Sequence, residues 1–205
     1  MDRLSPEEIK ELKKRLAEWQ KPQDMAAVIN NEARLSSSTL FNQGGLAFLR
    51  DAWIAAEFGE LRQADWVRLV DDRWPDFELR IDAKTEAYEA VEADDPTRRR
   101  GDKYRDKLEE AEDDLLEDIF ARAEQAHNWI AAACQKKADK RYTGRANLVV
   151  YLNLSEYGIR QMEVEACFPS ATEVAKDNFE AVWVLWKKRT YPVWRNGQPN
   201  LSNGH

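Results

Sequence analysis

Apolar residues along this chain recur with two different spacings. A spacing of three to four positions is typical of a helix with one buried face, whereas alternation or an unbroken apolar run of about five residues is typical of a strand. Helices are predicted at residues 6–21, 24–32, 45–62, 102–140 and 170–179. Strands are predicted at residues 66–70, 75–82, 85–93, 148–152, 181–186 and 191–194. The sequence therefore predicts an α+β fold in which a mixed central sheet is flanked by helices.

The strands at 75–82 and 85–93 are neighbours in the chain and are predicted to pair as a hairpin. A two-residue turn at 83–84 would place Glu78 directly opposite Glu89. Like charges in that arrangement are unfavourable unless a cation or a metal ion lies beside them. This register therefore predicts that the hairpin gathers negative charge on one face.

Acidic residues of this hairpin are candidate metal ligands. Asp76 follows Pro75 at the start of the first strand, and Glu89 lies on the same face of the second. Two carboxylates on neighbouring strands can hold Mg²⁺, which activates a water molecule for attack on a phosphodiester. A register slip of one residue would bring Glu92 near Asp76 in place of Glu89, so the sequence leaves both pairings open. Alternatively, these acids form the solvated face of the sheet.

The order helix, three strands, long helix, strand, helix, strand, with Pro75-Asp76 on the second strand and Glu89 on the third, resembles the PD-(D/E)XK nuclease superfamily. The resemblance implies a restriction-endonuclease-like fold and a Mg²⁺-dependent phosphodiester hydrolase that acts on nucleic acid. It implies that Asp76 and Glu89 are the metal ligands and that Asp76, Glu89 and Glu92 are the catalytic acids. The family's lysine, two residues after the second acid, is replaced by Val91. On this interpretation the chain is a divergent member.

The length of 205 residues fits one domain with a helical extension. An N-terminal helical segment is expected at 1–44, a nuclease-like core at 45–195 that includes the long helix 102–140, and a flexible tail at 196–205. The resemblance covers roughly residues 45–186 of this chain.

The net charge of −7 limits how the chain could contact nucleic acid. An acidic surface repels phosphate backbones, so any contact must be local. The most basic run follows directly after the strand at 85–93, where a nuclease of this family would meet the substrate phosphates. Its residues are Arg98, Arg99, Arg100 and Lys103. Alternatively, these cations pair with acids of the long helix.

A second function remains open, in which the same scaffold is a non-catalytic interaction module. The missing strand lysine, the acidic surface and the long helix all favour it. The helix at 102–140 would then bind a protein partner or a second copy of the chain through its apolar stripe.

The remaining composition excludes several classes. Cys134 and Cys167 do not form a Cys-x-x-Cys motif, and the chain contains only two histidines, so a zinc site and a Ser-His-Asp triad are not expected. The chain opens with charged residues, and no run approaches the ~20 apolar residues of a membrane span. We therefore expect a cytoplasmic protein without a membrane segment.

Overall fold

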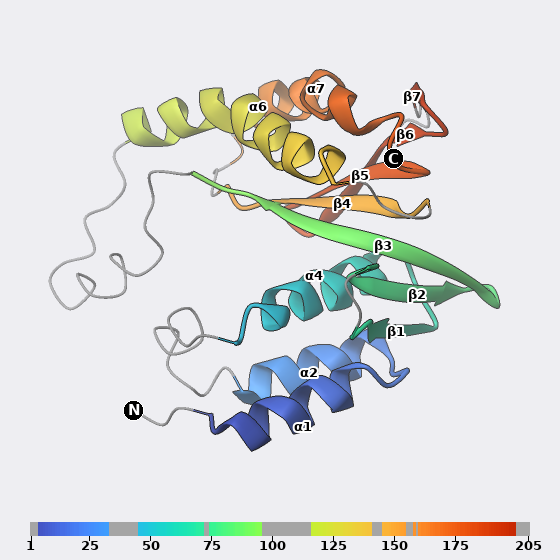
Figure 1. The fold of residues 1–205 in the computed structure, drawn as a ribbon. Coiled ribbons are helices and arrows are strands. Elements are labelled where there is room, and N and C mark those ends of the chain that lie inside the picture. Colours follow the sequence, from blue (N-terminus) through green and yellow to red (C-terminus); the bar gives the residue numbers. More distant parts are fainter. Residues whose placement is uncertain are drawn as a thin grey trace, which may run out of the picture. The chain divides into compact units, whose positions relative to one another are not determined.

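A computed structural model of the chain describes residues 4–32, 45–71, 74–95, 116–140, 145–154, 158 and 160–199. Its strands form one seven-stranded sheet in the order β1-β2-β3-β4-β5-β6-β7, drawn as arrows in Figure 1. The sheet is mixed, because β4 and β5 run parallel whereas β1 and β2 run antiparallel. The predicted α+β fold, with a central sheet flanked by helices, is confirmed, and the restriction-endonuclease-like core stays a prediction.

The chain divides into two compact units. The first contains residues 1–88 and 98–111, and the second contains residues 89–97 and 112–205. The third strand, β3 (Lys84–Ala93), begins in the first unit and ends in the second. The domain boundary predicted at residue 44 therefore falls inside the first unit.

The first unit contains three described helices and an antiparallel meander of strands. The helices are α1 (Pro6–Leu16), α2 (Pro22–Glu32) and α4 (Phe48–Leu61), and the other strands are β1 (Trp66–Leu69) and β2 (Phe77–Ile81). The ring of Phe58 on α4 meets the rings of Phe77 and Tyr88 edge-on, at centroid distances of 6.4 and 5.3 Å. Because Phe77 and Tyr88 are cross-strand partners, the helix covers that face of the meander.

The register predicted for the β2–β3 hairpin is wrong by two residues. The turn is Asp82-Ala83 rather than 83–84, and both of its residues have positive φ, 48° and 64°. Glu78 therefore lies opposite Ala87 and not opposite Glu89. Turns with two positive φ angles fit the twist of a hairpin, and Asp tolerates this conformation. The shift of two residues leaves every side chain on its predicted face but removes the predicted opposition of two acids.

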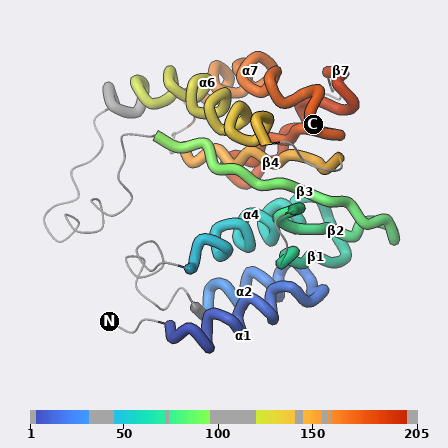
Figure 2. Tube along the Cα trace, in the orientation of Figure 1, coloured from blue at the N-terminus to red at the C-terminus, as the bar shows by residue number. Residues whose placement is uncertain are grey.

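The second unit packs helices on the remaining strands. Its helices are α6 (Leu116–Ala138), α7 (Gln161–Thr172) and the short 3₁₀ turn η1 (Glu173–Ala175), and its further strands are β4 (Asn147–Leu152), β5 (Ala181–Trp186), β6 (Arg189–Arg195) and β7 (Gln198–Pro199). Figure 2 shows α6 and α7 side by side. One buried cluster joins α6, α7 and the strands, with Ile130, Phe168 and Trp186 among its members.

Two helix predictions change in the second unit. The predicted helix at 170–179 is wrong, since α7 ends at Thr172, whose hydroxyl donates to the Phe168 carbonyl at 2.7 Å. Pro169 lies inside α7. Because proline usually ends a helix, its presence hides α7 in the sequence. Of the predicted helix 102–140, residues 116–138 form α6, and residues 102–115 lie outside the described residues.

The C-terminal segment contains more structure than the predicted tail. Residues 198–199 form β7, which pairs with the end of β6, whereas residues 200–205 lie outside the described residues. Of the helices that the structure describes, none combines the length and the apolar composition needed to cross a membrane.

Candidate functional site

Glu89 is a buried acid in the middle of a core strand. Its exposed fraction is 1%, and it follows Tyr88 and precedes Ala90 and Val91, all of them buried. Val91 and Ala93 belong to the apolar cluster that includes α6. Since alternate residues of a strand share a face, the Glu89 side chain leaves β3 on the side of α6.

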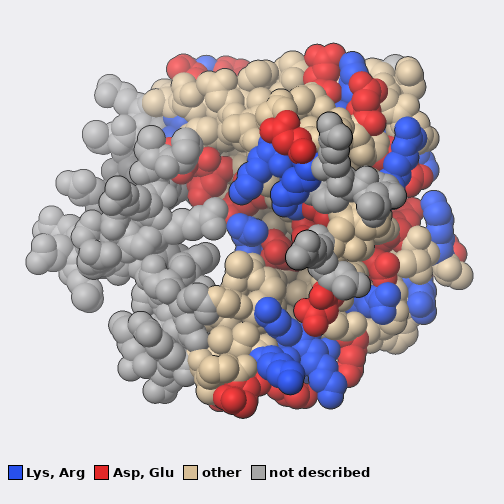
Figure 3. Space-filling view, viewed as in Figure 1, with Lys and Arg blue, Asp and Glu red and all other residues tan. Residues whose placement is uncertain are grey.

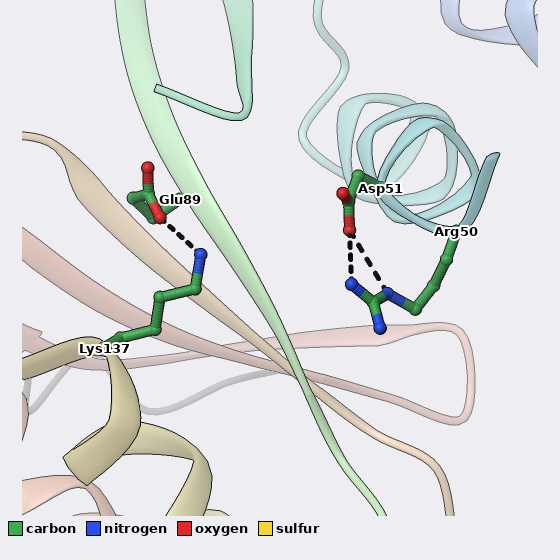
Figure 4. A network of polar contacts seen from close by, with 4 residues as sticks. All are labelled: Arg50, Asp51, Glu89 and Lys137. Carbon is green, nitrogen blue, oxygen red and sulfur yellow. Dashed lines mark hydrogen bonds and ion pairs between the residues drawn. The ribbon is translucent and has the colours of Figure 1, made fainter. Parts of the chain in front are cut away.

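Lys137 on α6 meets this acid. Ala126, Ile130 and Ala133 form the buried stripe of α6, and Lys137 continues it one helical turn later. Its ammonium group donates a hydrogen bond to Glu89 Oε2, as Figure 4 shows. The two side chains are 8% and 2% exposed. The sequence folds in this way because the rest of the stripe is apolar and holds α6 against the strands.

This buried ion pair is energetically costly. Removing a carboxylate and an ammonium group from water costs several kcal/mol for each ion, and their attraction offsets that cost only with good geometry and further hydrogen bonds. Apolar residues of similar volume would serve stability at least as well. Buried ionisable groups with a specific charge partner occur in functional sites and in structural ion pairs. The Glu89–Lys137 pair is therefore the strongest candidate site in the described part of the second unit.

Sequence reasoning missed Lys137. The lysine expected on the strand is Val91, which is packed in the apolar cluster with α6. The cation comes instead from a helix 48 positions away in the chain. A lysine on the buried stripe of an otherwise apolar helix face was the signal that could have revealed it.

Glu92 does not join Glu89. It lies three positions later on β3 and so points to the opposite face of the strand. Its Oε1 accepts a hydrogen bond of 2.8 Å from Asn153 Nδ2, which directly follows β4. The structure therefore separates these two predicted catalytic acids by the thickness of the sheet.

Asp76 lies directly before β2 in the first unit. Its backbone N–H donates to the Tyr88 carbonyl at 3.0 Å, and its carbonyl accepts from the Val70 N–H at 3.1 Å. Its backbone is thus fixed by both neighbouring strands. Because Glu89 belongs to the second unit, the shared metal site of Asp76 and Glu89 stays a prediction.

The donor atoms can be compared with what Mg²⁺ requires. Within the described ranges, no group of three or more His, Cys, Asp and Glu side chains is placed to hold a metal ion. Mg²⁺ usually keeps several water ligands and needs only one or two carboxylates. Glu89 supplies a carboxylate, the kind of oxygen ligand that Mg²⁺ binds. The donor chemistry of Glu89 therefore fits Mg²⁺.

The predicted contact surfaces are only partly described. Arg98, Arg99, Arg100 and Lys103 lie outside the described residues. On the face drawn in Figure 3, the described basic side chains form separate groups with acidic side chains between them. The apolar residues predicted to make α6 a binding helix, Ile130 and Ala133 among them, are buried in the unit's own cluster.

A second polar network supports the core of the first unit. The buried Tyr88 hydroxyl donates to Glu86 Oε2 at 2.5 Å and accepts from Arg62 at 3.2 Å. Burial raises the pKa of Tyr88 well above its ordinary value. Burial acts in the same direction on Glu86, but the Tyr88 hydrogen bond and the Arg62 charge lower its pKa overall. This network therefore keeps a neutral tyrosine and an ionised glutamate, and it anchors β3 to α4.

Arg50 and Asp51 on α4 form another ion pair in the first unit. Asp51 Oδ1 accepts from Arg50 Nε at 3.2 Å and from its terminal nitrogen at 3.0 Å, as drawn in Figure 4. Both side chains are partly exposed, at 38% and 22%, so the pair contributes little to stability.

Comparison of the chain with models of protein families, with curated proteins and with solved structures gives no match.

Proposed function

We propose that this chain is a Mg²⁺-dependent phosphodiester hydrolase that acts on nucleic acid. The observation that supports the proposal is the buried Glu89–Lys137 ion pair. In this pair, Glu89 stands at the strand position expected for a metal ligand, and Lys137 supplies the positive charge that β3 lacks at Val91.

Each residue has a distinct role in the proposed reaction. Glu89 would hold the cation through its carboxylate oxygens. Mg²⁺, when bound, supplies a Lewis acid and an activated water molecule. Lys137 orients Glu89 through its hydrogen bond, and its positive charge balances the charge of the buried carboxylate. Burial strengthens this interaction, because the surroundings of Lys137 screen its charge less than water does.

Cleavage of labelled oligonucleotides tests the proposal. The folded protein is incubated with fluorescein-labelled DNA or RNA in Mg²⁺, in Mn²⁺ and in EDTA. Cleavage is expected only with the metals. Glu89→Gln should abolish it, and Lys137→Met should lower the rate about 100-fold or more, as loss of one preorganised electrostatic group does.

Two variants serve as matched controls. Glu92→Gln changes an acid on the opposite face of β3 and should leave cleavage unchanged. Lys136→Met removes an exposed lysine adjacent to Lys137 and should also be silent. Calorimetric titration with Mn²⁺ adds a readout that does not depend on activity, since Glu89→Gln should weaken binding. Absence of metal-dependent cleavage in the folded wild-type protein would reject the proposal.

The second candidate is a non-catalytic interaction module on the same scaffold. It is favoured by the burial of the pair, since side chains that are 8% and 2% exposed leave little access for a substrate phosphate. In that case the wild-type protein binds no divalent cation and cleaves no oligonucleotide, and light scattering shows a complex with a partner or a second copy. The free thiols of Cys134 and Cys167 suit the reducing cytoplasm, where we propose that the protein acts.

A further inference from the structure

The face of the β1–β2 meander opposite α4 carries aromatic and basic side chains. Trp66 lies directly opposite Arg80, and Arg68 lies opposite Glu78. Cross-strand partners and alternate residues share a face, so these side chains lie on one side of the sheet. The residue between them, Val67, is fully buried on the other side.

Trp19 joins the same face from the segment after α1. The neighbouring residue Gln20 forms an antiparallel bridge with Val67, which places Trp19 beside Arg68. The guanidinium carbons of Arg68 and Arg80 lie 4.7 and 4.6 Å from the Trp19 ring centroid. We call Trp19, Trp66, Arg68 and Arg80 the tryptophan–arginine face.

Two features of this face remain available for a ligand. Trp66 is 39% exposed, one of few large apolar side chains so exposed among the described residues. Arg68 pairs with Glu78 at 2.7 Å, whereas no described carboxylate forms an ion pair with Arg80. The Arg80 guanidinium is oriented by Trp19 and keeps its charge for an outside anion.

A flat exposed ring beside an oriented guanidinium matches the chemistry of single-stranded nucleic acid. Exposed bases stack on aromatic side chains, and arginine binds the intervening phosphates. A duplex hides the faces of its bases, and an acidic peptide offers carboxylates without flat rings for Trp66. The positive charge on an otherwise acidic chain favours a polyanion at this place.

We propose that the tryptophan–arginine face binds single-stranded nucleic acid. The proposal rests on the proposed function, for which it specifies the substrate class. It assigns stacking to Trp66 and phosphate binding to Arg80. Trp19 positions Arg80 without contacting the strand in this assignment.

Fluorescence anisotropy of a fluorescein-labelled oligothymidine in EDTA tests binding without cleavage. Trp66→Ala and Arg80→Gln should each weaken binding about fivefold or more, as the loss of one stacked base or one phosphate contact does. Trp66→Phe keeps an aromatic ring and should restore most of the affinity. The matched control is Trp53→Ala on α4, which removes a tryptophan that is 37% exposed. This control should bind as the wild type does.

The outcomes separate this inference from the proposed hydrolase. Oligonucleotide binding that needs Trp66 and Arg80, without cleavage in Mg²⁺, supports the binding face and rejects the hydrolase. Cleavage that is unaffected by Trp66→Ala and Arg80→Gln, with unchanged binding, rejects the binding face and retains the hydrolase. No binding to the single strand, equal binding to a duplex of the same length, or tighter binding to an acidic peptide would each overturn the inference.

Discussion

Replacement of Lys137 by methionine should destabilise the protein strongly. Methionine fills a similar volume but removes the ammonium group that donates to Glu89 Oε2. The Glu89 side chain is only 2% exposed, so its negative charge then stays in the core without this cation. A single isosteric change therefore tests whether the pair is buried and coupled as the structure describes.

The size of the effect follows from the burial of both groups. Removing one partner of a buried ion pair costs about 3–5 kcal/mol, because the remaining charge stays desolvated. For a chain of this length each kcal/mol lowers the melting temperature by about 2–4 °C. We therefore expect Lys137→Met to melt roughly 6–20 °C below the wild type.

Thermal unfolding followed by circular dichroism measures this loss, with Lys136→Met as the exposed control. The double variant Glu89→Leu/Lys137→Met separates the cost of the lone charge from the loss of packing. It should unfold within about 1 kcal/mol of the wild type or above it, because an apolar pair replaces the ions. A melting temperature of Lys137→Met equal to that of the wild type would refute the reasoning, as would a double variant less stable than the single one.

Two further predictions concern other parts of the second unit. The β5–β6 turn places Lys187 and Lys188 at positive φ, 51° and 56°, whereas the β6–β7 turn uses Asn196-Gly197 at 51° and 73°. Replacing the two lysines by Asn-Gly should raise the free energy of unfolding by about 1 kcal/mol, because Gly and Asn adopt positive φ at little cost. An unchanged or lower melting temperature would contradict that explanation. Burial raises the pKa of the Cys167 thiol to about 11. The thiolate is the form that reacts with iodoacetamide. Cys167 should therefore react about a hundredfold more slowly than an exposed cysteine at pH 8, and its rate should rise with pH up to about 11. A rate equal to that of free cysteine would contradict this prediction.

The sequence predicted the elements better than their details. Apolar alternation located β2 because one of its faces is covered, and the continuous run of β4 predicted a strand covered on both faces. The register of the hairpin failed because a turn of Asp82-Ala83 has no glycine or asparagine to mark it. Pro169 concealed α7, which continues past it, for a related reason, since the local signal opposed the tertiary packing that decides the outcome.

Lys137 shows why the candidate site was harder to find than the fold. In a strand motif, residues two positions apart lie on the same face, and that spacing is visible in a sequence. Lys137 reaches Glu89 only because α6 packs on β3. In the sequence, the apolar stripe of α6 indicates a helix with a buried face and does not reveal which strand it packs on. If the lysine served only the fold, an apolar residue would stabilise that position at lower cost. The double variant decides between the two explanations: full stability without metal-dependent cleavage means that the ion pair serves chemistry, and full stability with cleavage intact means that it does not.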